Sequence, residues 1–226
     1  MKSNPTPLFD RAPRFSRTQA AHIALRAFTL IELITVMAII ILIATFVTPA
    51  ATSILKGNQL TQASEMVSDQ LGYARQSALA LNQPVEVRFY QYGDPSVPGE
   101  SISNPTTWRY NAMQLFQITS SGAVPFGKVQ VLPNTIIIDS GSTLSSIIVS
   151  ATTSNVSIPR VGTNYNYVPF RFLVDGSTNL SPPTGSFFLT LHNFNYGDGL
   201  AAPPPNFFTL QVDPVNGHVK KFHPGI

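Results

Sequence analysis

Glu32 is the only charged residue in the apolar run from Ala27 to Thr48, which reads AFTLIELITVMAIIILIATFVT. A carboxylate left unpaired near the end of a membrane-length segment costs on the order of 2–3 kcal/mol in lipid. The presence of this carboxylate therefore needs a physical reason, and that reason is where the function should be sought.

No catalytic motif accompanies Glu32. The chain has no Gly-x-Ser-x-Gly, no phosphate-binding glycine loop and no His-Glu-x-x-His. It also has no cysteine, which excludes disulfides, thiol catalysis and cysteine zinc sites. His192, His218 and His223 are too isolated to predict a metal site, and Asp94 and Asp198 are too sparse to predict calcium binding. We expect neither an enzyme nor a cofactor.

The apolar run is long enough to cross a membrane. Phe28 to Val47 is 20 residues, about 30 Å as a helix, which matches the hydrocarbon core of a bilayer. The preceding residues, 1–27, hold five bases and one acid, whereas the rest of the chain holds nine bases and ten acids. The basic leader therefore predicts a single span with a cytoplasmic N-terminus and a C-terminal part outside.

The string FTLIELITVMAIIILI resembles the class III signal of type IV pilins and type II secretion pseudopilins. The resemblance implies that a membrane aspartyl peptidase cleaves between Ala27 and Phe28 and methylates the new amino group of Phe28. It also implies that Glu32, four residues after Phe28, pairs with the amino terminus of a neighbouring subunit. The alternative for Glu32 is a side chain that reaches to water at the interface. Ala27 stands where the family usually has glycine, which puts the efficiency of cleavage in question.

The same resemblance implies partners and a location. The partners are the prepilin peptidase, other pilin or pseudopilin subunits, an inner-membrane assembly platform and, before assembly, the lipid bilayer. The protein would lie in a bacterial inner membrane with a periplasmic head and then enter a filament. Pro49 stands where pilins commonly have a helix-kinking proline, although it could also begin a separate helix at its first turn.

The remaining chain predicts an α+β molecule, in which a long hydrophobic, then amphipathic helix packs on a mainly antiparallel β-sheet head. We divide it into a leader (1–27), a transmembrane or filament-core helix (28–48), an amphipathic extension (49–82) and a β-rich head (83–226). The extension is indicated by apolar residues every three or four positions: Leu60, Ala63, Val67, Leu71, Ala74, Ala78 and Leu81. The head is indicated by alternating segments between turn residues. The strand candidates are Val85–Tyr90, Trp108–Ile118, Lys128–Leu132, Thr135–Asp139, Leu144–Ser150, Tyr167–Val174, Ser186–Asn193, Phe207–Val212 and His218–Phe222.

Within the family, two parts of the chain resemble the GspH/FimT group of minor pseudopilins. These are LGYARQSALALNQPVEVRF from Leu71 to Phe89 and the late segments with Asp175-Gly176 and Asn216-Gly217 turns. Pilin-like proteins of the Verru_Chthon cassette type share the amino-terminal signal, so this alternative stays open. The resemblance implies a structural subunit, without deciding between secretion, pilus and DNA-uptake machines.

Two other functions stay open beside the filament subunit. One is a DNA-binding or adhesive minor pilin at a pilus tip, which would use loops such as Asn193–Asn206. For DNA, the contacts would be Lys220 and Lys221, although two lysines beside an aromatic residue also fit a charged edge strand. We do not expect nucleic acid as the partner. The other function is an uncleaved single-pass anchor that displays a β domain.

Overall fold

The computed structural model describes residues 29–93, 108–133, 135–150, 153–158, 162–182 and 184–224; of residues 46–56, 156–158 and 162–164 it describes the backbone alone. The chain divides into two compact units, residues 1–47 and 48–226. Ala27 and Phe28, the expected cleavage and methylation positions, lie outside the described residues.

The expected long helix is present as α1 (Leu30–Leu81). Pro49 lies within its bounds, and the expected kink there stays a prediction. The helix ends because Asn82 adopts a left-handed conformation, with a φ of 50°, a conformation that asparagine tolerates better than most residues. In the stretches that the structure describes, we find no helix that combines the length and the hydropathy required for crossing a bilayer.

The head is a ten-stranded sheet in which every observed pairing is antiparallel. Its main path has the order β10-β9-β8-β5-β2-β1-β7-β6, and β3 and β4 pair with β2 beside this path. The strands are β1 (Val85–Tyr92), β2 (Arg109–Thr119), β3 (Gly122–Pro125), β4 (Gln130–Val131), β5 (Ile136–Ile138), β6 (Ser154–Ile158), β7 (Gly162–Phe172), β8 (Phe187–Asn193), β9 (Phe207–Val212) and β10 (Val219–Phe222).

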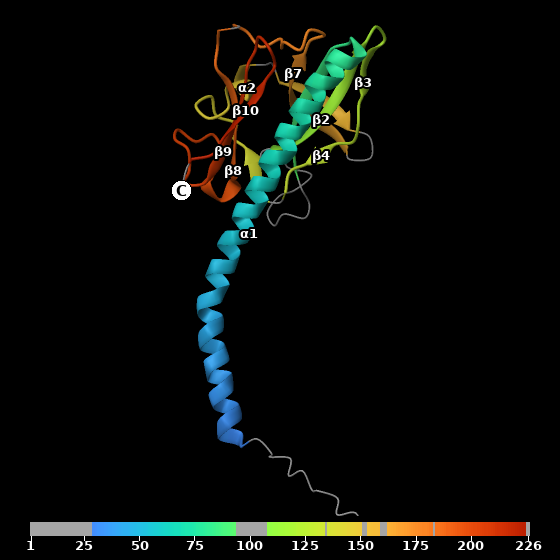
Figure 1. Cartoon of the computed structure of the whole chain (residues 1–226). Helices are drawn as coiled ribbons and strands as arrows, with labels where there is room; N and C mark the ends of the chain where they lie inside the picture. The colour runs from blue at the N-terminus through green and yellow to red at the C-terminus, as the bar shows by residue number, and fades with distance from the viewer. Residues whose placement is uncertain are drawn as a thin grey trace, which may run out of the picture. The chain divides into compact units, whose positions relative to one another are not determined.

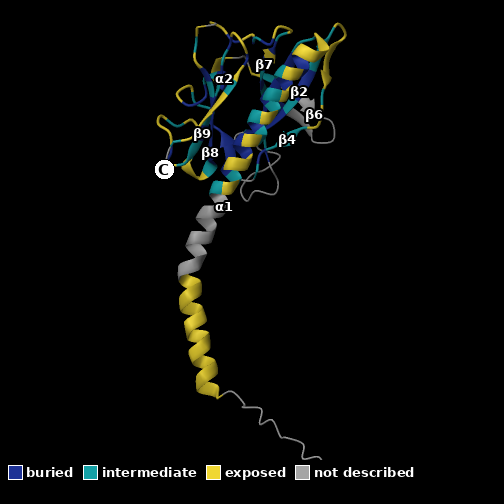
Figure 2. Cartoon of the chain, in the orientation of Figure 1, coloured by how far each residue is buried: buried dark blue, intermediate teal, exposed yellow. Residues whose placement is uncertain are grey.

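The second half of α1 packs along one face of this sheet (Figure 1). Every predicted face residue from Leu60 to Ala78 is buried, which confirms the amphipathic pattern. Leu81, predicted for the same face, is instead 44% exposed, because the helix ends there. Figure 2 shows the alternation of buried and exposed residues in this part of the helix. The structure thus confirms the α+β architecture, a helix on a mostly antiparallel sheet.

The opposite face of the sheet holds a second, aromatic cluster. Its buried members are Tyr90, Trp108, Ala112, Phe116 and Tyr165. Because both faces of the central strand β1 are covered, its first six residues are all buried.

One predicted strand is wrong: Leu144–Ser150 contains the short helix α2 (Ser146–Ser150) instead. The backbone turns beforehand, since the N–H groups of Leu144 and Ser145 both donate to the Gly141 carbonyl. The hydroxyls of Ser145 and Ser146 then accept hydrogen bonds from the N–H groups of Thr190 and Phe188 on β8. Serine side chains therefore take the place that a pairing strand would occupy beside β8.

Candidate functional site

Glu32 forms a capping box with Thr29 at the start of α1. Its Oε2 atom accepts hydrogen bonds from the Thr29 N–H (2.9 Å) and the Thr29 hydroxyl (2.8 Å). In return, the Thr29 hydroxyl oxygen accepts from the Glu32 N–H at 3.3 Å. This reciprocal bonding satisfies donors that the first helical turn otherwise leaves unpaired. The capping role of Glu32 could have been predicted from the Thr-x-x-Glu spacing in the sequence. Considering only the cost of a carboxylate in lipid does not reveal it.

The surface that follows this capping box is apolar on all sides. Every large aliphatic side chain from Leu30 to Ile43 is exposed, between 47% for Val36 and 76% for Leu30. Figure 2 shows this part of the helix as continuously exposed. The only carboxylate on it is Glu32, and its Oε1 atom accepts no hydrogen bond from the described residues. The arrangement offers one acceptor within an unpartnered apolar surface.

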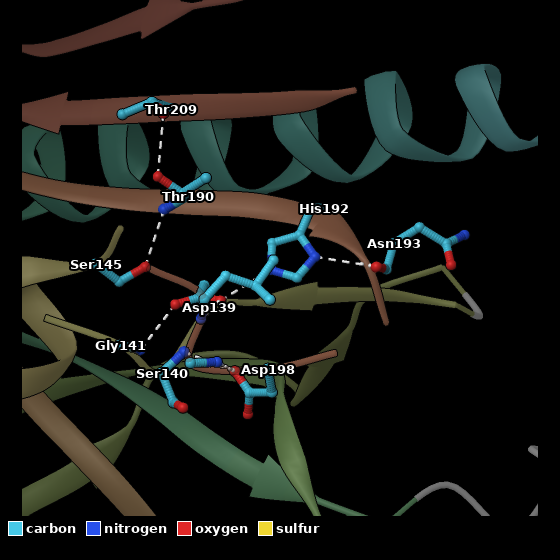
Figure 3. Close-up of polar contacts among 11 residues, drawn as sticks. Asp139, Ser140, Gly141, Ser145, Thr190, His192, Asn193, Asp198 and Thr209 are labelled. Carbon is cyan, nitrogen blue, oxygen red and sulfur yellow. Dashed lines mark hydrogen bonds and ion pairs between the residues drawn. The ribbon is translucent and has the colours of Figure 1, made fainter. Parts of the chain in front are cut away.

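A different polar cluster lies inside the head, around Asp139 and His192 (Figure 3). Both side chains are fully buried, and the His192 Nε2 atom lies 3.0 Å from Asp139 Oδ2. Asp139 also accepts hydrogen bonds from the N–H groups of Gly141 (2.8 Å) and Leu200 (3.1 Å). The other ring nitrogen of His192 lies 3.0 Å from the Asn193 carbonyl oxygen.

This cluster is built to hold loops rather than to react. Both nitrogens of His192 lie within hydrogen-bond distance of protein atoms and the side chain is fully buried, so it offers no accessible atom to a substrate or a metal. Asp198 accepts from the N–H groups of Ser140 and Gly199, each at 2.8 Å. His192 and Asp198, which the sequence offers as conceivable ligands, thus serve as loop anchors. Among the described residues there is no group of three or more histidine or acidic side chains that could hold a metal.

The two lysines of the conceivable DNA site lie on β10, which forms one edge of the sheet. Lys220 is exposed, whereas Lys221 forms an ion pair with Glu65 on α1 and lies 5.7 Å from the centre of the Phe208 ring. An acidic partner beside Lys221 reduces the positive charge that it can offer to a phosphate. The arrangement fits a charged edge strand that packs on the helix.

No family model matches this chain, and no curated protein matches it. Among solved structures, this chain is distantly similar to a minor pseudopilin and a minor pilin. The minor pseudopilin EpsH from the type 2 secretion system of Vibrio cholerae is 12% identical, with a TM-score of 0.42, and the match covers 74% of this chain and 99% of that chain. The type IV minor pilin FimU of Pseudomonas aeruginosa is 13% identical, with a TM-score of 0.43, and the match covers 72% of this chain and 87% of that chain.

Proposed function

We propose that this protein is a structural subunit of the minor pilin or pseudopilin type in a type IV pilus or type II secretion filament. It is inserted in the inner membrane with its basic leader in the cytoplasm, cleaved between Ala27 and Phe28, and methylated on Phe28. It then assembles with other subunits through the first part of α1. The protein is a building block, and the peptidase supplies the chemistry.

The observation that carries this proposal is the apolar surface of α1 from Leu30 to Ile43. A monomeric protein in water rarely leaves so much contiguous apolar surface uncovered. A helix that is apolar all round belongs in lipid or among other helices. The basic leader supports a bilayer as the first environment, and the FTLIE string supports a bundle of subunit helices as the later one.

Glu32 supplies the specificity of assembly. The capping box uses its Oε2 atom, so Oε1 can accept a hydrogen bond from the methylated amino group of a neighbouring subunit. In an apolar bundle, such a pair offsets the cost of burying either charge alone and fixes the axial register. The capping box and the intermolecular pair are therefore compatible roles of one carboxylate.

The processing step is tested by co-expressing the full chain with a prepilin peptidase and determining the mature amino terminus by mass spectrometry. We expect a chain that begins at methylated Phe28. The Ala27→Gly variant, which restores the residue usual in the family, should be processed at least as fast. Processing at another bond would overturn the filament proposal, and no processing in either chain would overturn it in favour of an uncleaved anchor.

The assembly role of Glu32 is tested with three variants. Glu32→Gln keeps the capping box, because glutamine also serves at this position, but it removes the charge. Thr29→Val keeps the charge and removes the hydroxyl of the cap. If Glu32 pairs with an amino terminus, Glu32→Gln and Glu32→Val should insert into membranes yet fail to enter filaments, while Thr29→Val should still assemble. Normal assembly of Glu32→Gln would reduce the role of Glu32 to capping.

A further inference from the structure

A hollow of about 250 Å³ in the head is lined by Leu60, Ile136, Asn193, Asn195, Tyr196 and Asn206. We propose that this hollow binds a neutral sugar, a single hexose unit of a carbohydrate. The proposal does not depend on filament assembly, because every one of these residues belongs to the compact unit 48–226.

The wall of the hollow is held in place by Asn193 and Thr135. The Asn193 amide donates to the Thr135 hydroxyl at 2.9 Å, and its Oδ1 atom accepts from the Asn195 N–H at 3.0 Å. The Phe194 N–H donates to the Thr135 carbonyl at 2.8 Å. Thr135 itself has a φ of 78°, which is strained for a β-branched residue. These bonds fix the short helix η2 (Phe194–Tyr196) beside β5.

Two amides at the hollow stay free to bind. Within the described residues, the side chains of Asn195 and Asn206 make no hydrogen bond. Asn206 precedes β9, and because Phe207 pairs with His192, it lies at the same end of the sheet as Asn193. Each amide offers donors and an acceptor on one planar group. This combination suits sugar hydroxyls, which also donate and accept.

The rest of the lining suits the C–H surface of a sugar ring. Leu60 and Ile136 form an apolar floor, each only 2% exposed. Tyr196 is 48% exposed, so its ring is available for packing against a ligand. An aromatic ring with a polar tip combines apolar contact with hydrogen bonding. The volume lies below the ~300–1,000 Å³ of pockets for drug-sized ligands, which favours one sugar unit.

The uncharged lining of the hollow argues against charged ligands. None of its described lining residues carries a charge. A phosphate or carboxylate ligand would need lysine or arginine, and a metal cation would need carboxylates. A neutral ligand with many hydroxyl groups is the class that the described residues can satisfy.

Binding is tested on the full chain in phosphocholine nanodiscs, which avoid the sugar head groups of maltoside detergents. The probes are the methyl glycosides of glucose, galactose and mannose, with glucuronic acid as a charged counterpart. Saturation-transfer NMR should show binding of at least one neutral glycoside, with glucuronic acid bound roughly tenfold more weakly. No transfer to any neutral glycoside, or stronger binding of glucuronic acid, would overturn the proposal.

Variants locate the site. Asn206→Asp keeps the side-chain shape but removes the donor, and we expect it to weaken binding roughly tenfold. Tyr196→Ala should do the same. Tyr73→Ala is the matched control, since Tyr73 is 50% exposed but lies on α1 and stacks on Phe126. Equal binding by wild type and Asn206→Asp, or an equal loss in Tyr73→Ala, would overturn the assignment to this hollow.

Discussion

Asp139 and His192 form a fully buried pair that joins β5 and β8 to the loop after η2. Removing Asp139 leaves the buried His192 ring and the N–H groups of Gly141 and Leu200 without this partner. An unsatisfied buried group costs about 1–3 kcal/mol. We therefore expect Asp139→Ala to lower the free energy of unfolding by about 3 kcal/mol. Denaturant unfolding of the full chain measures the loss. The control is Asp69→Ala at an exposed position of α1, which should change stability by about 0.5 kcal/mol or less.

Tyr90 offers a pH test at the residue scale. Burial raises the pKa of Tyr90 to about 12, although nearby Arg88 opposes the shift. An unfolded tyrosine ionises near pH 10, so the folded state holds this proton longer than the unfolded state. The resulting stability is complete below about pH 10 and is lost as the pH rises towards 12.

Titration of phenolate absorbance checks this prediction. The buried tyrosines should ionise after the exposed ones, Tyr90 last, and the step near pH 12 should vanish in Tyr90→Phe. The variant should also unfold with a weaker dependence on pH in the alkaline range. A step near pH 12 of unchanged size in Tyr90→Phe would assign that step to another residue, such as Tyr110, whose pKa is also raised by burial.

At the scale of elements, the packing of α1 on the sheet depends on the helix face that contacts the sheet. Leu71 is fully buried against the sheet, whereas Leu79, two turns later, is 43% exposed. Leu71→Ala should cost about 2–5 kcal/mol, because it leaves a cavity in the core as well as losing burial. Leu79→Ala should cost about 1 kcal/mol or less. Thermal unfolding of both variants compares the two faces, and equal losses would contradict the observed packing.

The edge strand β10 is tied to α1 by Lys221 and Glu65. Their side chains are 31% and 53% exposed, so solvent screens the pair. A double-mutant cycle with Lys221→Ala and Glu65→Ala should give a coupling of about 0.2–1 kcal/mol that falls with salt.

A DNA gel shift on wild type and on Lys220→Ala/Lys221→Ala should show no retardation in either chain. Retardation that is lost in the double variant would revive the DNA-binding alternative.

At the scale of the whole molecule, the proposal predicts opposite sides of a membrane for the leader and the head. Because the chain has no cysteine, single cysteines report their location without interference. Ser120→Cys in the exposed β2–β3 turn should react with an impermeant maleimide in spheroplasts. Ser3→Cys in the leader, measured before cleavage in cells without the peptidase, should react only after permeabilisation. Equal labelling of both positions would contradict a single span.

Local sequence patterns were sufficient to predict the buried face of the helix and the position of a turn. The spacing of Leu60 to Ala78 predicted the buried face of α1, because neighbours on a helix are also neighbours in the sequence. The Asp175-Gly176 turn is predictable for the same reason, with Gly176 at a φ of 82°. The strand predicted over Leu144–Ser150 was wrong, because a short apolar run has no periodicity that distinguishes helix from strand.

Other features were decided by the tertiary structure only. Asp139 and His192 are 53 positions apart, and Leu60 lies far along the chain from Asn206, so nothing local pairs them. Pairing of β5 with β8 brings Asp139 and His192 together, and packing of α1 on the sheet brings Leu60 beside the hollow. Both depend on long-range contacts rather than on neighbouring residues. The sequence by itself determined the helix, its apolar start and the position of Glu32. The tertiary structure decided which polar side chains form the hydrogen bonds that hold loops in place and which remain free at the surface.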